Sequence, residues 1–403
     1  MIESTQEIAK REIKDSLKLS AFCMRLIGFS LNTPKTLTSI FLQKLTFVAT
    51  IFGVGIHVFS EITFLCVTSA NSPRVEDVVP LIHTVGYGIL SISKFAVLNF
   101  KRSVFAQLLD DLTSIWPVPP IDKEAENIKQ KSLNALRLVH SWFFGLNLSG
   151  VWFYIITPIG LYLYNNLRGQ NYKIRTVWKS WYPFNIYSKT WIHVIVYIFE
   201  IFSGQSCVWV MICSDLLFSG MASHIVLLLK LLQNRLRVLG ENKKTDEEDY
   251  QEITECIKLH QRLIRYCNDL EDAFSLVNLI NILLSSVNIC CVVFVIVLLE
   301  PLMGMSNKLF LGASLIQIGV ICWYGEDIIH ANANVAEAAY NSKWYELSPR
   351  CRRSLAFLIQ RAQKPIAFTA LNFTNISLVT YSAILTRSYS YFTLLYTMYS
   401  ESY

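Results

Sequence analysis

The chain has 403 residues, of which 53% are hydrophobic and only 16% are charged, and its mean hydropathy is +0.37. This balance is too apolar for a soluble domain of that length, and it predicts an all-α protein that crosses a membrane several times. The formal net charge is +6, but the basic residues lie in the gaps between apolar runs. We therefore interpret them as topology signals and do not expect nucleic acid as a partner.

The chain begins with a charged segment, residues 1–39, in which Ile13 to Phe29 place apolar side chains on one face. This pattern predicts an amphipathic helix at the cytoplasmic membrane surface, with a disordered tail as the alternative. Seven apolar windows long enough to span a bilayer follow, at 40–66, 78–100, 142–164, 191–218, 274–299, 308–330 and 366–398. We divide the rest of the chain into a six-span region, 40–330, a cytoplasmic anchor region, 331–364, and a last span with a short tail, 365–403.

An odd number of spans places the two termini on opposite sides of the membrane, so the orientation decides the class of protein. With the N-terminus in the cytoplasm, 26 Lys and Arg residues fall in the inner segments and 8 in the outer ones. Because positive charge favours the cytoplasmic side, we predict a cytoplasmic N-terminus and an extracellular C-terminus. This orientation is opposite to that of a G-protein-coupled receptor.

The inner segments are long and predict helical extensions of the spans. Five residues before the fifth span recur at spacings of four and three: Ile253, Ile257, His260, Ile264 and Cys267. Such a seam joins either neighbouring subunits or two helices of one chain. A second inner helix is indicated by Ser348 at the cap position with Pro349 in the first turn, and we expect it to end before Pro365, which begins the last span.

Ionisable residues inside the predicted spans are functional candidates by default. We interpret Lys94 as snorkelling to the inner interface, Asp215 and His224 as pairing within the bundle, and Glu200 as making a structural hydrogen bond. The aromatic segment 178–191 between the third and fourth spans is typical of an interfacial belt, with a lid over a ligand as the alternative. No catalytic motif or metal-ligand spacing occurs, so we expect neither an enzyme nor a cofactor.

Aromatic and small residues gather in the outer halves of four spans. If their faces converge, they enclose a mostly apolar cavity suited to a small volatile or lipid-like ligand; ordinary helix packing is the alternative. The predicted lining residues are His83, Tyr87 and Leu90; Asn147, Gly150, Val151 and Tyr154; Phe199, Phe202 and Ser206; and Leu309, Gly312, Ala313 and Ile316. The last span carries many hydroxyls instead, which we expect to contact the bundle or to line a water-filled path.

Three short motifs in the last third resemble the C-terminal signature of insect odorant receptors. They are AAYNSKWY at 338–345, QKP at 363–365 and SYSYF at 388–392. Related gustatory receptors end differently, and the second pair of inner segments is shorter than in the shared olfactory coreceptor. The resemblance therefore indicates a ligand-tuned subunit.

This resemblance implies an odorant-gated, non-selective cation channel that forms a heterotetramer with the coreceptor in the plasma membrane of olfactory sensory neurons. The last span would line the pore, with Leu394 and Met398 as a hydrophobic gate and Thr397 at the filter position. The alternatives are a gustatory-type channel subunit, a metabotropic seven-helix receptor and a transporter.

Overall fold

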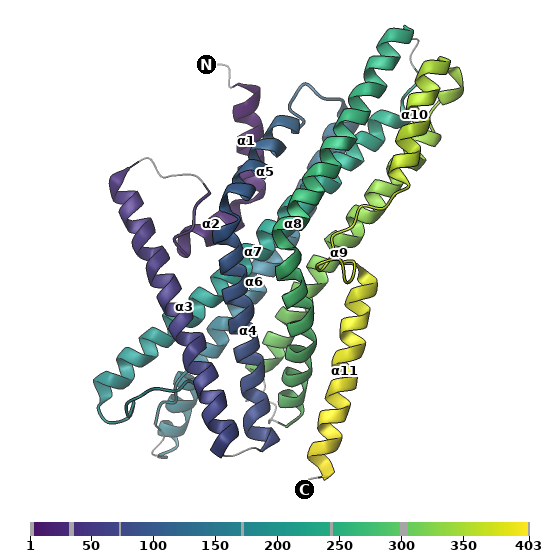
Figure 1. Ribbon diagram of the computed structural model, residues 1–403. Coiled ribbons are helices and arrows are strands. Elements are labelled where there is room, and N and C mark those ends of the chain that lie inside the picture. The colour runs from purple at the N-terminus through teal and green to yellow at the C-terminus, as the bar shows by residue number, and fades with distance from the viewer. Residues whose placement is uncertain are drawn as a thin grey trace.

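The computed structural model describes residues 4–31, 36–71, 74–170, 173–241, 245–298 and 305–401. Over these residues the protein is a bundle of α helices, and the single β contact is an isolated bridge between Thr369 and Asn375 (Figure 1). The helices are α1 (Thr5–Ser16), α2 (Lys18–Leu26), α3 (Leu37–Asn71), α4 (Val75–Phe100), α5 (Arg102–Ile115), α6 (Lys123–Leu167), α7 (Thr190–Arg237), α8 (Asp246–Leu298), α9 (Met305–Tyr340), α10 (Pro349–Ala362) and α11 (Leu378–Glu401), with a 3₁₀ turn at Trp344–Glu346.

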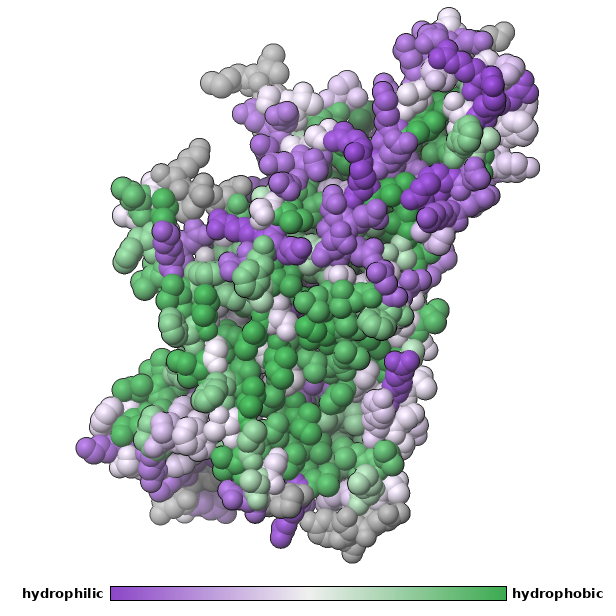
Figure 2. Space-filling view, viewed as in Figure 1, coloured by the Kyte–Doolittle hydropathy of each residue, from purple (hydrophilic) through white to green (hydrophobic). Residues whose placement is uncertain are grey.

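Six described helices, α3, α4, α6, α7, α8 and α9, are long and apolar enough to cross a membrane. The seventh, α11, has 24 residues, which exceeds the length needed for a bilayer, but its hydroxyls and tyrosines lower its hydropathy. It packs along α8 and α9 and ends at the same side as the α4 N-terminus (Figure 1). The protein is therefore the predicted polytopic seven-helix bundle. Figure 2 shows its broad hydrophobic band below a hydrophilic end that carries α10.

The start of the last helix differs from the prediction. α11 begins at Leu378 rather than at Pro365, and the intervening chain forms a hairpin in which the Ile376 amide donates to the Phe368 carbonyl at 2.8 Å. Pro365 lacks an amide proton, and the Thr and Asn side chains that follow compete for backbone hydrogen bonds, so a helix is disfavoured here. Asn372 at the tip has a positive φ of 60°.

Two contacts hold this hairpin against the bundle. The Glu326 carboxylate of α9 accepts a hydrogen bond from the Leu378 amide at 3.1 Å, which caps the first turn of α11. Gly325 lies against the hairpin so closely that a Cβ there would come within 2.1 Å of the Ile376 carbonyl oxygen. The hairpin therefore fixes where α11 starts relative to α9.

The cytoplasmic extensions of α7, α8 and α9 form a second packed region together with α10. Ile253, His260, Ile264 and Cys267 are buried inside the chain, so this seam joins helices of one molecule. The His260 ring contacts the Asn332 side chain at 2.9 Å, and Asn332 donates to the Ala362 carbonyl, which ends α10. The predicted start of α10 is confirmed, with Ser348 as its N-cap and Pro349 in the first turn.

The N-terminal segment is helical, as expected, and packs on the bundle through buried polar contacts. Ser16 at the end of α1 hydrogen-bonds His224 of α7 at 2.8 Å. Glu12 accepts from the Trp116 indole at 2.6 Å and pairs with Lys129 of α6 at 2.6 Å. The apolar face of α1 and α2 therefore belongs to the protein core, and the expected pairing of His224 within the bundle is confirmed.

Candidate ligand site and pore helix

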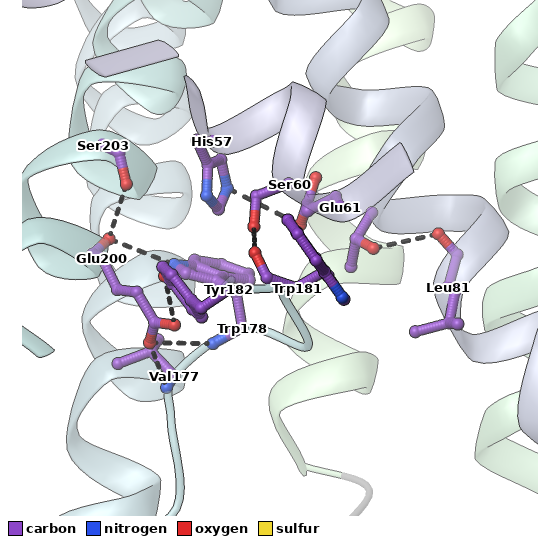
Figure 3. Close-up of polar contacts among 11 residues, drawn as sticks. His57, Ser60, Glu61, Leu81, Val177, Trp178, Trp181, Tyr182, Glu200 and Ser203 are labelled. Carbon is purple, nitrogen blue, oxygen red and sulfur yellow. Dashed lines mark hydrogen bonds and ion pairs between the residues drawn. The ribbon is translucent and has the colours of Figure 1, made fainter. Parts of the chain in front are cut away.

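The outer loop between α6 and α7 is folded into the bundle by one buried carboxylate. Glu200 is 0% exposed and accepts hydrogen bonds from the Val177 amide at 2.7 Å and the Tyr182 hydroxyl at 3.0 Å. The Trp178 indole donates to the Glu200 carbonyl at 3.2 Å (Figure 3). Burial and the neighbouring carboxylate raise the pKa of Tyr182, so its hydroxyl keeps the proton that it donates. The structural hydrogen bond predicted for Glu200 is confirmed.

The same loop is also joined to α3. The Ser60 hydroxyl donates to the Trp181 carbonyl at 2.5 Å, and the Trp181 amide donates to the Ser60 carbonyl at 3.2 Å. Gly204 on α7 leaves room for the loop, because a Cβ there would lie 2.6 Å from the Trp178 indole nitrogen. Trp178 thus covers the bundle from the outer side, whereas Trp191, in the first turn of α7, is exposed at the periphery.

Beneath Trp178 lies a cavity of about 650 Å³ of space between atoms, part of which opens to the surface. Its wall combines residues of α3, α4, α6, α7 and α9 with the loop tryptophan. Seven residues predicted from the sequence lie in this wall: His83, Tyr87, Asn147, Gly150, Val151, Tyr154 and Ala313. The further wall residues are Glu61, Thr84, Trp178, Gly204, Cys207, Val208, Phe310, Ser314 and Gln317.

The remaining predicted lining residues are not part of this wall. They are Leu90, Phe199, Phe202, Ser206, Leu309, Gly312 and Ile316. Phe202 packs its ring toward Gly53 of α3, and Ile316 is exposed on the outside of the bundle. Each lies on a predicted helix, but α4 and α9 place only part of the expected face in the wall, and α7 contributes Gly204, Cys207 and Val208 instead of the expected residues.

Aromatic rings surround Phe310 at the centre of the wall. Its ring meets His83 and Tyr87 edge to face, with centroids 5.4 and 5.3 Å apart. Tyr154 stacks on Trp178 with centroids 5.3 Å apart and donates its hydroxyl to Asn307. The cavity therefore offers flat, polarisable surfaces to a small apolar molecule.

A buried ion pair lies below the cavity. Lys94 of α4 is 1% exposed, and its Nζ contacts Asp215 Oδ1 of α7 at 2.5 Å. Gln317, which lines the cavity from α9, donates to the other carboxylate oxygen at 2.9 Å. The predicted pairing of Asp215 is confirmed, but the interpretation of Lys94 as snorkelling is wrong, because its ammonium group is directed into the bundle. Three spans are thereby joined to the cavity floor.

The pore-helix candidates lie on the outside of a single chain. Leu394 and Met398 are 62% and 55% exposed, and Thr397 is exposed between them. The opposite face of α11 packs on α4 and α8 through Phe392, Leu395 and Tyr399, which contact the cluster around Val79 and Phe294. The face that carries Leu394 and Thr397 is thus turned away from the apolar cluster around Val79 and Phe294.

Four hydroxyls of α11 donate within their own helix rather than to the bundle, while the expected lining of a water-filled path stays a prediction. Thr386, Ser390 and Thr397 each donate to a carbonyl four residues earlier in the same helix, at 2.9 to 3.0 Å. Thr393 does the same three residues earlier. The protons of these four hydroxyls are therefore used within α11, and only their oxygen lone pairs are left for other partners.

A second hollow, of about 1290 Å³ including its open side, connects the cavity wall to α11. It shares His83, Thr84, Tyr154 and Trp178 with the cavity and reaches Tyr399 of α11. The Tyr399 hydroxyl lies 3.5 Å from the Glu76 carboxylate at the start of α4. α4 thus contributes to both hollows and contacts α11.

These features define a polytopic helical membrane protein with a mostly apolar cavity in its outer half and an exposed, hydroxyl-bearing last helix. A sequence profile described as 7tm Odorant receptor matches residues 76–389, most of the chain. The chain belongs to the insect odorant receptor family, whose members are receptors rather than enzymes.

Similar proteins match along nearly the whole length. Odorant receptor 67c of Drosophila melanogaster is 24% identical over 406 residues, covering 100% of both chains. Odorant receptor 85c of the same organism is 27% identical over 370 residues, covering 89% of this chain and 92% of the relative. The olfactory receptor OR5 of Machilis hrabei, solved in complex with eugenol, has a TM-score of 0.82 at 16% identity and covers 98% of this chain and 100% of its own, a likeness of fold.

Proposed function

We propose that this chain is the odorant-binding subunit of a ligand-gated, non-selective cation channel. The observation that carries the proposal is the position of α4 between the two functional regions. One part of α4 contributes His83 and Tyr87 to the cavity, and another contributes Val79 to the cluster that holds α11. A rearrangement of α4 around a ligand therefore displaces α11.

Gating follows from a difference in affinity between two packings of the bundle. A volatile molecule that fits the cavity better when α4 and α9 have shifted stabilises that packing, and the equilibrium moves toward it. Because α11 contacts α4 and α8, its exposed face turns with them and moves Leu394 and Met398 relative to the pore axis. Separating two aliphatic constriction residues allows water and then cations to pass.

The channel is completed by other subunits. The face of α11 that carries Leu394, Thr397 and Met398 is exposed in one chain, as expected for a helix that meets its counterparts at a central pore. We propose that these counterparts belong to the olfactory coreceptor in a heterotetramer. The assembly would lie in the plasma membrane of an olfactory sensory neuron and associate through the cytoplasmic extensions.

The test is to express the chain with the coreceptor and to record ionic current without added G protein. Replacing Leu394 or Met398 by Ser is expected to raise the ligand-free current, because a polar constriction stays wet. Ile198→Ser is the matched control, since Ile198 is an equally exposed aliphatic residue, at 60%, on α7. Unchanged leak and unchanged ion selectivity in both α11 variants would show that this helix does not line the pore.

A further inference from the structure

Two buried polar side chains in the cavity wall have atoms without a partner. Glu61 is 3% exposed; its Oε1 lies 3.6 Å from His57 Nε2, and its Oε2 has no hydrogen-bond partner among the described residues. His83 is 4% exposed, and neither of its ring nitrogens has a hydrogen-bond partner among the residues that the structure describes. Buried polar atoms are normally paired, because an unpaired one costs free energy. These atoms are therefore set to receive a group that the described protein does not supply.

Neighbouring polar groups do not fill this role. Thr84, which also contacts the Glu61 side chain, donates its hydroxyl proton to the Leu81 carbonyl at 3.0 Å, and the Asn147 amide donates to the Phe143 carbonyl at 2.9 Å. The Tyr154 hydroxyl donates to Asn307. The nearest hydrogen-bond donors are thus already bonded to other groups of the protein.

The rest of the wall determines the body of the ligand. Trp178, Phe310 and Val208 provide apolar and aromatic surface, and Gly150 and Ala313 provide space. A molecule that satisfies this wall has a short apolar or aromatic body with one polar end. The polar end would be directed at Glu61 and His83.

We infer that the cavity selects molecules with a hydrogen-bond-donating head group, namely an alcohol, a phenol or a primary amine, over molecules of the same shape whose polar atom only accepts. Glu61 Oε1 faces His57, so a proton on this carboxyl is best placed there and Oε2 remains an acceptor, whereas a neutral imidazole either donates or accepts. A hydroxyl donates to Glu61 Oε2 and accepts from His83. An ether oxygen facing Glu61 Oε2 is repelled instead, because both atoms are acceptors. This inference rests on the proposed function only in that the cavity is taken as the ligand site.

The test compares pairs of probes that differ in the donor alone. Para-cresol is paired with para-methylanisole, and benzyl alcohol with benzyl methyl ether. Binding to the full chain, co-assembled with the coreceptor in lipid nanodiscs, is measured by ligand-induced thermal stabilisation, and current is recorded separately in cells. One added hydrogen bond corresponds to a preference for the donor of about fivefold.

Glu61→Met keeps the length of the side chain and removes the acceptor. It is expected to reduce the donor-to-ether ratio to about one, mainly by weakening the donor. Val208→Ala is the matched control, because it removes apolar contact from both members of a pair and leaves their ratio unchanged. Comparison with this control shows that a change in the donor-to-ether ratio, rather than a change in affinity, measures the loss of the Glu61 carboxyl group.

Three results would overturn the inference: equal binding of donor and ether to the wild-type chain, a ratio that survives Glu61→Met, or no binding of either member of any pair. Equal binding is also the result expected if a resident water satisfies Glu61. A preference for donors in the binding assay supports the inference whatever the current shows. Ligands that bind but evoke no current would instead contradict the proposed channel function.

Discussion

Removing one partner of the buried Lys94 and Asp215 pair is expected to destabilise the bundle far more than removing both. At an effective dielectric constant of 20, two charges 2.5 Å apart attract by about 6–7 kcal/mol. Burial of each ion opposes this by several kcal/mol, so the net contribution of the pair is small. Lys94→Met leaves Asp215 charged and buried, with Gln317 as its remaining partner in a direct contact.

We therefore expect Lys94→Met and Asp215→Leu each to cost about 3–5 kcal/mol, whereas the double replacement by apolar side chains is close to neutral. The measurement is the unfolding free energy of the purified chain in mixed micelles, supported by melting temperatures. A double-mutant cycle then gives the coupling. If the two single losses simply add in the double variant, the residues do not act as a pair and the reasoning is refuted.

Three further predictions concern the hairpin and the cytoplasmic region. Gly325→Ala is expected to abolish ligand-evoked current, because the new Cβ would meet the Ile376 carbonyl at 2.1 Å and displace the start of α11. Gly55→Ala is the control, since nothing lies within 4 Å of a Cβ at that position. Normal currents in both variants would contradict the proposed role of the hairpin. Ser348→Ala removes the N-cap of α10 and should lower the unfolding free energy by about 1 kcal/mol, while Ser348→Gly costs only a few tenths. Burial lowers the pKa of His260 below its usual 6.5, so the unfolded state takes up a proton first and the stability of the fold decreases as the pH drops below that value. His260→Gln should flatten the pH dependence of the melting temperature between pH 7.5 and 5.5. An equally steep pH dependence in the variant would refute the assignment to His260.

Much of the fold could be predicted because it depends on local patterns. Long apolar windows identify the helices, and the Ser348 and Pro349 pair locates the start of α10. The start of α11 could not be predicted in the same way. The stretch after Pro365 is apolar enough to continue a span, and only its contacts with α9 reveal a hairpin.

The residues of the cavity also divide into those that local sequence patterns predict and those that depend on contacts between distant segments. Helical spacing places His83 and Tyr87 on one face, and the structure directs that face inward. Trp178 comes from a loop whose path depends on Glu200, and Lys94 meets a partner on another helix, so neither position follows from spacing along the chain. Glu61 was absent from our candidates, although its spacing of four from His57 within the first span was a usable signal.

The internal hydrogen bonds of α11 have a mechanical consequence. Since Thr386, Ser390, Thr393 and Thr397 donate to carbonyls of their own helix, these bonds travel with the helix when it moves. A rotation or slide of α11 leaves these bonds intact and breaks its apolar contacts with the bundle together with a few polar ones, such as that of Tyr399 with Glu76. These four hydroxyls therefore add no hydrogen bond between helices that a movement of α11 would have to break.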